Sequence, residues 1–237
     1  MRIIHEESVG STNDYIKDLN EENALVYADS QHNGRGQRGN SWESEPYANL
    51  TFSIMLRPSF LPADRQFELS MLVSLSIVRT LEKFGISPFI KWPNDIYVGD
   101  RQISGILIEN EITSGGNISR CVIGAGINVN QSEFYSDAPN PTSLIIETGE
   151  KHVVEDVLKV FTAVFEEMYH AFRNGSLDVL SLYLEKLYRK DVLADYRDEG
   201  GRFRGIIRDI GDYGALRVEK DSGAICEYHF KEIEYIL

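Results

Sequence analysis

The sequence predicts an α/β protein in which a larger domain of helices packed on a sheet is followed by a small β-rich domain. Three observations predict this class. Apolar residues recur at helical spacing over residues 63–84, short β-rich runs fill residues 89–129, and beyond Asp191 short strands alternate with glycine turns. A long amphipathic helix that packs on a sheet, with a second domain after it, accounts for all three.

The elements of the N-terminal part follow in order along the chain. Ser11-Thr12-Asn13 precedes apolar residues at helical spacing, which predicts a helix whose start is capped by a polar side chain. Strands are expected at residues 25–28 and 50–56. Between them, residues 31–42 are rich in Gly, Asn and Arg and predict a loop. Gly85 then ends the long amphipathic helix.

The C-terminal part contains two more helices and then only strands. Helical patterns cover residues 153–172 and 177–188. Short β-like runs with turns between them follow at residues 203–207, 215–218 and 224–230, the pattern of a small antiparallel barrel. We therefore place a domain boundary near residue 190 and expect domains of residues 1–190 and 191–237.

Composition limits the partners and the compartment. The 37 acidic residues outnumber the 24 basic ones, and a formal net charge of -13 repels a phosphate backbone, so we expect no nucleic-acid partner. No window approaches about 18 consecutive apolar residues, and the N-terminus lacks the pattern of a signal peptide. Cys121 and Cys226 stand in no disulfide or metal pattern. These features predict a cytoplasmic protein without a membrane partner.

The loop over residues 31–42, QHNGRGQRGNSW, combines glycines with Arg35 and Arg38. Glycine lets backbone N–H groups approach a ligand closely, and arginine offers a fork of donors to a carboxylate or phosphate. The loop therefore indicates anion binding, although a flexible solvated turn remains open from this motif alone. It is not a P-loop, because the GxxxxGK[ST] spacing is absent.

Two further motifs stand at the ends of predicted strands. Lys91-Trp92-Pro93-Asn94-Asp95 ends in an amide and a carboxylate, which suit a Mg²⁺ ion that nucleotide phosphates also bind. From this motif alone, Asn94 and Asp95 forming only a turn stays an alternative. Residues 124–130, GAGINVN, lack the GxGxxG spacing of a dinucleotide fingerprint. The interpretation that remains is that the glycines let the backbone approach a ligand closely and that Asn128 hydrogen-bonds to the edge of an adenine.

Four motifs occur in the order and spacing of one family. They are STN at 11–13, QHNGRGQRGNSW at 31–42, KWPNDIYVGDRQISGILIEN at 91–110 and IGAGINVN at 123–130. Each is weak alone, but GRGxxGxxW, KWPND and GxGIN together are specific, and the chain resembles the biotin-protein ligase family over essentially its whole length. Because STN begins at residue 11, we expect the short form, without the N-terminal DNA-binding domain of the members that repress transcription.

The resemblance implies a fold and an activity. The fold is a catalytic domain like that of class II aminoacyl-tRNA synthetases, with a mixed sheet, and an SH3-like C-terminal β-barrel. The activity is a ligase that uses ATP and Mg²⁺ to activate biotin as biotinyl-AMP, then transfers biotin to a lysine of a biotin carboxyl carrier protein of acetyl-CoA carboxylase or a related biotin enzyme. A homodimer through an edge of the sheet is also plausible from the resemblance.

The resemblance also implies a role for each matching position. The biotin site is expected to contain Ser11, Thr12, Asn13, Gln31, Gly34, Arg35, Gly36, Gln37, Gln102 and Gly105. ATP is expected to be held by Arg38, Trp42, Lys91 and Asn128, and Mg²⁺ by Asn94 and Asp95. Arg35, Lys91 and Asp95 are the expected catalytic residues.

The chain departs from the common family pattern at Gln37, Asn40 and Gln102, where basic residues are usual. Gln102 occupies the place of a lysine that meets the activated carboxylate, so the role of that lysine cannot be carried over. Two alternatives stay open. A lipoate-protein ligase shares the adenylation chemistry but lacks the Trp-Pro of KWPND, and a non-catalytic descendant would bind biotin or a carrier without activating it.

Overall fold

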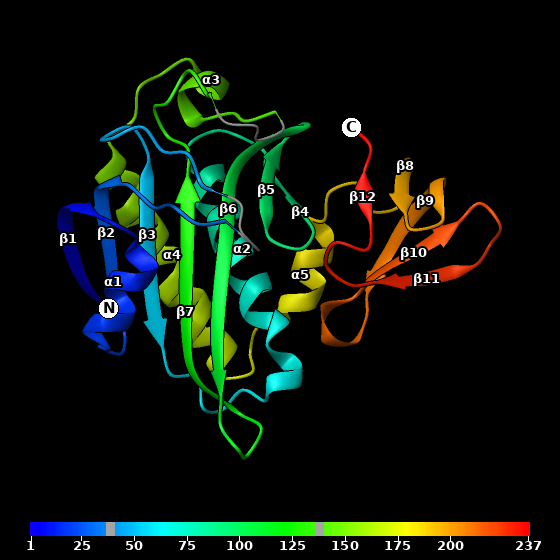
Figure 1. The fold of residues 1–237 in the computed structure, drawn as a ribbon, viewed down its shortest axis with the longest axis horizontal. Helices are drawn as coiled ribbons and strands as arrows, with labels where there is room; N and C mark the ends of the chain where they lie inside the picture. The colour runs from blue at the N-terminus through cyan, green and yellow to red at the C-terminus, as the bar shows by residue number, and fades with distance from the viewer. Residues whose placement is uncertain (37–40, 136–139) are drawn as a thin grey trace.

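The computed structural model describes residues 1–36, 41–135 and 140–237. A seven-stranded mixed sheet forms the centre of the larger domain, in the order β1-β2-β3-β7-β6-β5-β4 (Figure 1). Its strands are β1 (Arg2–Val9), β2 (Ala24–Gln31), β3 (Leu50–Leu56), β4 (Phe89–Lys91), β5 (Asp95–Val98), β6 (Arg101–Ile112) and β7 (Ile118–Ile127). The pair β1–β2 is parallel and is joined by the crossover helix α1 (Thr12–Leu19); the other neighbouring pairs are antiparallel.

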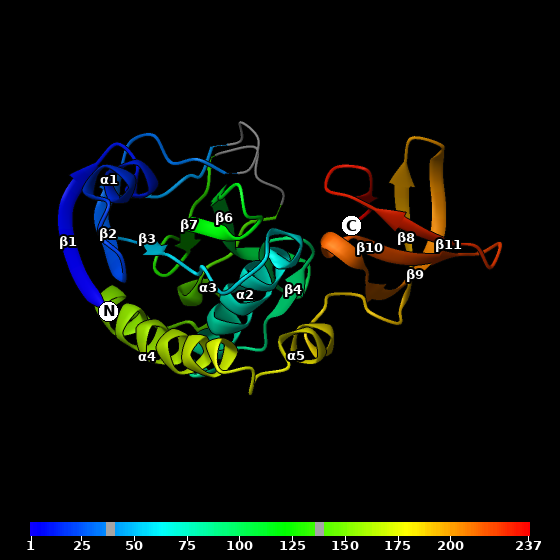
Figure 2. The ribbon, with the colours of Figure 1, turned by 90° about the horizontal axis from the view of Figure 1, so that it is seen from below.

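Helices cover the two faces of this sheet unequally. The long helices α2 (Phe67–Glu82) and α4 (Val154–Arg173) pack on one face, and α1 lies on the other (Figure 2). Strand β3 is buried along its whole length because its side chains alternate between the two faces. Phe52 packs against Phe161 of α4, with ring centroids 4.6 Å apart, and Ser53 faces α1. The face that carries α1 is therefore the face with room for polar groups.

The second domain is a five-stranded antiparallel sheet in the order β11-β10-β9-β8-β12. Its strands are β8 (Leu193–Asp198), β9 (Gly201–Ile210), β10 (Leu216–Lys220), β11 (Ile225–Tyr228) and β12 (Glu234–Tyr235). In the described part of the chain, the remaining elements are α3 (Leu144–Thr148), α5 (Val179–Glu185) and the short 3-10 helices η2 (Ala63–Arg65) and η3 (Asp212–Gly214). The small domain lies beside the β4 and β5 edge of the large sheet (Figure 1).

Direct contacts fasten the small domain to the large one. The indole nitrogen Nε1 of Trp92 donates a hydrogen bond to the carbonyl oxygen of Gly214, at 2.9 Å. Gly214 has a φ of +82°, and a Cβ atom there would lie 2.3 Å from the ring of Phe67. Only glycine fits at this position, because a side chain would be strained by its backbone angle and would collide with α2.

The predicted α/β class and the β-rich C-terminal part are confirmed, but several details differ. Ser11 precedes α1, yet its side chain makes no capping hydrogen bond. The helix expected from residue 63 begins at Phe67, because residues 63–65 form a separate 3-10 turn. Strands β1, β8 and β12 had no sequence prediction. β1 is an edge strand in which polar residues predominate, and β12 has two residues, so neither carries a clear apolar alternation.

Candidate active site

A cleft of about 980 Å³ opens on the face of the large sheet that carries α1, between that helix and the small domain. It is lined by most of the residues that the sequence predicted: Ser11, Thr12, Asn13, Gln31, Arg35, Gly36, Trp42, Lys91, Asn94, Asp95, Gln102, Gly105 and Asn128. Gly34 lies beside the cleft and not in its lining. Gln37, Arg38 and Asn40 lie outside the described residues. One cleft therefore gathers the predicted biotin, ATP and Mg²⁺ residues.

At the α1 end of the cleft, Thr12 and Gln31 bind each other. The side-chain oxygen Oε1 of Gln31 accepts hydrogen bonds from the backbone nitrogen of Thr12 at 2.9 Å and from its hydroxyl at 3.1 Å. The amide nitrogen of Gln31 therefore points the other way, toward Gly34, where a Cβ atom would lie 2.8 Å from it. A side chain at position 34 would collide with this amide, and glycine avoids the collision.

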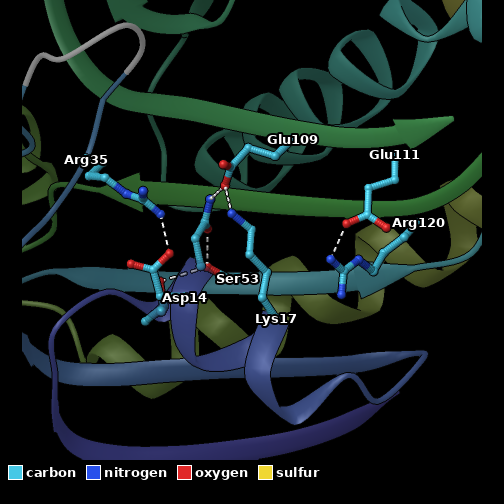
Figure 3. A network of polar contacts seen from close by, with 9 residues as sticks. Asp14, Lys17, Arg35, Ser53, Glu109, Glu111 and Arg120 are labelled. Carbon is cyan, nitrogen blue, oxygen red and sulfur yellow. Dashed lines mark hydrogen bonds and ion pairs between the residues drawn. The ribbon is translucent and has the colours of Figure 1, made fainter.

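Asn13 is also buried at this end. Its amide nitrogen Nδ2 donates to Oε2 of Glu109 at 3.0 Å, and its oxygen Oδ1 accepts from the hydroxyl of Ser53 at 2.5 Å. The ammonium group of Lys17 contacts the same Glu109 oxygen at 2.7 Å. Figure 3 shows part of this network, in which Glu109 of β6 and Lys17 of α1 face each other. A Cβ atom on Gly124 would lie 2.2 Å from Oδ1 of Asn13, so glycine is required beneath it.

Arg35 does not stand free in the cleft. Its guanidinium group forms an ion pair and hydrogen bond with the carboxylate of Asp14 from the first turn of α1 (Figure 3). Both side chains are about half exposed, at 45% for Arg35 and 56% for Asp14. Exposed ion pairs of this kind contribute only about 0.2–1 kcal/mol, so an anionic ligand can displace Asp14.

The indole ring of Trp42 packs against two glycines of the sheet. A Cβ atom on Gly126 would lie 2.3 Å from Nε1 of Trp42, and one on Gly105 would lie 3.0 Å from its ring. The Trp42 backbone nitrogen donates to the carbonyl oxygen of Gly34 at 3.0 Å, which links the ring to the glycine-rich loop. Nε1 itself is buried and has no hydrogen-bond partner among the described residues.

At the opposite end of the cleft, Lys91 is held among aromatic rings and one carboxylate. Its ammonium nitrogen Nζ donates to the hydroxyl of Tyr97 at 3.1 Å and lies 4.0 Å from Oδ2 of Asp95. The same nitrogen lies 4.8 Å from the ring centroid of Tyr97 and 5.2 Å from that of Tyr235. Burial lowers the pKa of Lys91, while Asp95 opposes this shift.

Asp95 and Gln102 are neighbours at this end. Burial raises the pKa of the Asp95 carboxyl to about 6, against the opposing effects of Lys91 and of a hydrogen bond from the Gln102 side chain. Asn94 is nearly buried, and its Nδ2 donates to the carbonyl oxygen of Ile106 at 2.7 Å. That bond turns the Asn94 side-chain oxygen away from Ile106. Gln102, predicted at the biotin site, thus contacts the carboxylate predicted at the metal site.

Asn128 also lines the cleft. Its Nδ2 donates to the carbonyl oxygen of Thr142 at 2.9 Å, which fixes the orientation of the amide. Its oxygen Oδ1 is buried and has no hydrogen-bond partner among the residues that the structure describes. A buried acceptor left unpaired costs free energy, and a donor group on a ligand, such as an exocyclic amine, would satisfy it.

The comparisons with known proteins agree with this geometry. The model of the biotin/lipoate A/B protein ligase family matches residues 6–128, just over half of the chain. This chain belongs to that family. Over 231 residues it is 31% identical to the bifunctional ligase/repressor BirA of Bacillus spizizenii, an alignment that covers 93% of this chain and 70% of the relative.

Other members of the biotin/lipoate A/B protein ligase family match over most of their length. The biotin–[acetyl-CoA-carboxylase] ligase of Paracoccus denitrificans is 27% identical over 84% of this chain and 85% of its own. The structure of the biotin protein ligase from Aquifex aeolicus in complex with biotin and ATP superposes with a TM-score of 0.82 at 26% identity, and covers 98% of this chain and 97% of that one. The predicted family and fold are therefore confirmed.

Several residues of this family member's site were assigned no role from the sequence. Glu109 is on the same face of β6 as Gly105, and its position four residues further along a predicted strand was a usable signal. Ser53 offered a weaker signal, because it is a polar residue in an otherwise apolar strand. Tyr235 offered none, because it lies in the other domain.

Within the described residues, no three His, Cys, Asp or Glu side chains form a cluster that would hold a metal ion by themselves. In the same part of the chain, no helix is both long and apolar enough to cross a membrane.

Proposed function

We propose that this chain is an ATP-dependent biotin-protein ligase, which converts biotin to biotinyl-AMP and transfers the biotinyl group to a lysine of a biotin carboxyl carrier protein. One observation carries the proposal. A single cleft brings the fixed amides of Asn13 and Gln31, suited to a polar ring, together with the partly buried Lys91 and Asp95, suited to a nucleotide and its metal. The family and the named relatives support the same activity.

The two ends of the cleft suggest where each substrate lies. We assign the biotin ring to the end formed by Ser11, Thr12, Asn13 and Gln31, and its carboxylate to the side of Arg35 and Gly36. The adenine ring fits between Trp42 and Asn128, where the unpaired Oδ1 of Asn128 accepts from its exocyclic amine. Lys91 then lies on the phosphate side.

The donor set at Asn94 and Asp95 fits a magnesium ion. Mg²⁺ prefers oxygen ligands and retains several waters, so one carboxylate and one amide oxygen suffice when nucleotide phosphates supply further ligands. Asp95 presents the carboxylate, and Asn94 has its oxygen directed away from Ile106. When bound, the ion would neutralise charge on the phosphates.

The reaction then follows from charge and position. A carboxylate oxygen of biotin attacks the α-phosphorus of ATP, the bond to the β-phosphate oxygen breaks, and pyrophosphate leaves. The acceptor lysine then attacks the mixed anhydride as a neutral amine, and AMP leaves. Arg35 and Lys91 hold two anions together and stabilise the charge that develops on phosphorus.

The transfer step proceeds without an enzyme nucleophile. Cys121 is fully buried, and burial raises its pKa to about 12, so its thiol stays protonated at neutral pH. Both Cys121 and Cys226 are unpaired, which is typical of a reducing compartment and supports a cytoplasmic location. A homodimer through an edge of the large sheet stays a prediction, which sedimentation at micromolar protein tests.

The deciding experiment measures pyrophosphate release and transfer of label to a carrier domain, with biotin or with lipoate as the acid. We expect release of pyrophosphate with biotin and ATP. We expect label on the carrier domain from biotin and none from lipoate. Label from lipoate without label from biotin would make the chain a lipoate ligase. Binding of biotin without pyrophosphate would make it a non-catalytic descendant.

A further inference from the structure

Glu109 and Lys17 lie outside the cleft lining, and Glu109 contacts Asn13, a residue inside it. The carboxylate of Glu109 accepts from Nδ2 of Asn13 at 3.0 Å and from Nζ of Lys17 at 2.7 Å, through the same oxygen. Asn13 is 4% exposed and lies against Gly124. Glu109 reaches Asn13 from β6, whereas Lys17 reaches Glu109 from the next turn of α1 (Figure 3).

These contacts decide which way the Asn13 amide points. A carboxylate can only accept hydrogen bonds, so the amide nitrogen must face Glu109 and the amide oxygen must face Ser53. A flipped amide would bring its oxygen against the carboxylate and would lose the hydrogen bond. Of the two N–H bonds on Nδ2, one is therefore committed to Glu109, and the other is the group that Asn13 offers to a ligand.

Glu109 is equipped to stay ionised in this position. Partial burial acts to raise its pKa, but the hydrogen bonds from Lys17 and Asn13 outweigh burial, and the net effect is a lowered pKa. A protonated Glu109 would be able to donate to the Asn13 oxygen and so would permit the flipped amide. Lys17 therefore preserves the acceptor-only character on which the orientation of Asn13 depends.

We propose that Glu109, supported by Lys17, is a positioning residue that holds Asn13 as a hydrogen-bond donor and thereby selects a substrate ring with a carbonyl acceptor. This inference rests on the proposed function. A cyclic urea such as that of biotin offers a carbonyl oxygen to this donor, whereas a dithiolane ring offers only sulfur, a weak acceptor. The selection between biotin and lipoate thus depends in part on a residue that touches neither.

The test compares Glu109→Gln with Glu111→Gln. Glu111 lies two residues further along β6 and pairs with Arg120 near the same network, as Figure 3 shows. A glutamine at 109 can present either its oxygen or its NH₂ group to Asn13, so the amide is free to flip. A glutamine at 111 removes an equivalent charge from the same strand and leaves Asn13 held.

The readout is the dissociation constant of three ligands, measured by calorimetry on the full chain. For Glu109→Gln we expect biotin and desthiobiotin, which both contain the urea group, to bind about tenfold more weakly, the loss of roughly one hydrogen bond. ATP should bind as in the wild type. At saturating biotin, kcat should stay within about twofold, because Glu109 does not touch the reacting carboxylate. Glu111→Gln should match the wild type for all three ligands.

A second variant covers the case in which Glu109→Gln does not fold. Ser53→Ala removes the donor to the Asn13 oxygen and should weaken biotin and desthiobiotin binding but not ATP binding. If Glu109→Gln and Ser53→Ala both bind biotin as tightly as Glu111→Gln does, the positioning role is overturned and the proposed function stands. If the wild-type protein itself does not bind biotin, the proposed function fails.

Discussion

Lys91 and Tyr235 belong to different domains, yet the ammonium nitrogen of Lys91 lies 5.2 Å from the centre of the Tyr235 ring. A cation within about 6 Å of an aromatic face is attracted by the electron density of the ring. The last strand of the small domain therefore helps to hold a cation that we place beside the ATP phosphates. The small domain is thus a part of the site and more than an appendage to it.

We predict that Tyr235→Leu raises the KM for ATP, by roughly 2-fold to 30-fold, since a cation–π contact contributes about 0.5–2 kcal/mol. The KM for biotin should change little, because Tyr235 lies at the other end of the cleft. Tyr235→Phe is the matched control. It keeps the ring and removes a buried hydroxyl that has no partner among the described residues, so kinetics should be preserved and the melting temperature should not fall. Equal KM values for ATP in the Leu and Phe variants would contradict a role for the Lys91–Tyr235 contact in ATP binding.

Asp14→Asn should tighten biotin binding. In the ligand-free protein, the carboxylate of Asp14 occupies the guanidinium group of Arg35, for which the carboxylate of biotin must compete. Because exposed ion pairs contribute about 0.2–1 kcal/mol, we expect a decrease in Kd of up to about fivefold at low salt. The gain should shrink at high salt. Arg35→Ala should abolish detectable ligation in either background, and an Asp14→Asn variant that binds biotin more weakly would argue against the competition.

The affinity for Mg·ATP should fall as the pH is lowered through about 6. Burial raises the pKa of Asp95 to about 6, so below that pH the carboxyl group is increasingly protonated and neutral. A neutral carboxyl cannot bind the ion, and the loss approaches roughly tenfold per pH unit. Asp95→Asn should reduce formation of biotinyl-AMP steeply, remove this pH dependence and leave biotin binding intact. A variant with the wild-type pH profile would exclude Asp95 as the titrating group.

Gln102→Lys should slow the release of biotinyl-AMP. The Gln102 side chain already reaches the Asp95 carboxylate, so a lysine there places a cation at the phosphate end of the cleft. A new charge-assisted hydrogen bond to the phosphate is worth roughly tenfold in the off-rate. Gln102→Met, similar in length but uncharged, is the control. A chase of labelled biotinyl-AMP measures the off-rate in both variants. An unchanged off-rate in the lysine variant would show that a lysine at position 102 is not needed to retain the intermediate. We expect Gln37→Arg to slow the release of biotinyl-AMP as well, although residue 37 lies outside the described residues.

Local patterns were sufficient for most of the fold. Residues 50–56 were predicted as a strand and form β3 with those bounds, because alternating apolar residues and a following turn act within a few positions of each other. The helix expected over residues 153–172 forms α4 almost unchanged. Where the structure differs, as at Ser11, a side chain that the local pattern assigned to a helix cap is used by the cleft instead.

The sequence by itself determined the fold class, the family and the motif residues of the site, because these depend on periodicity and on residues within one loop or strand end. Only the tertiary structure decided which side chains hold those residues in place. Asn13 and Glu109 are 96 positions apart, and Lys91 and Tyr235 come from different domains. Such contacts depend on which strands pair and how two domains dock. Strand pairing and domain docking depend on the apolar surface that the whole chain buries, so no short stretch of sequence carries a signal for them.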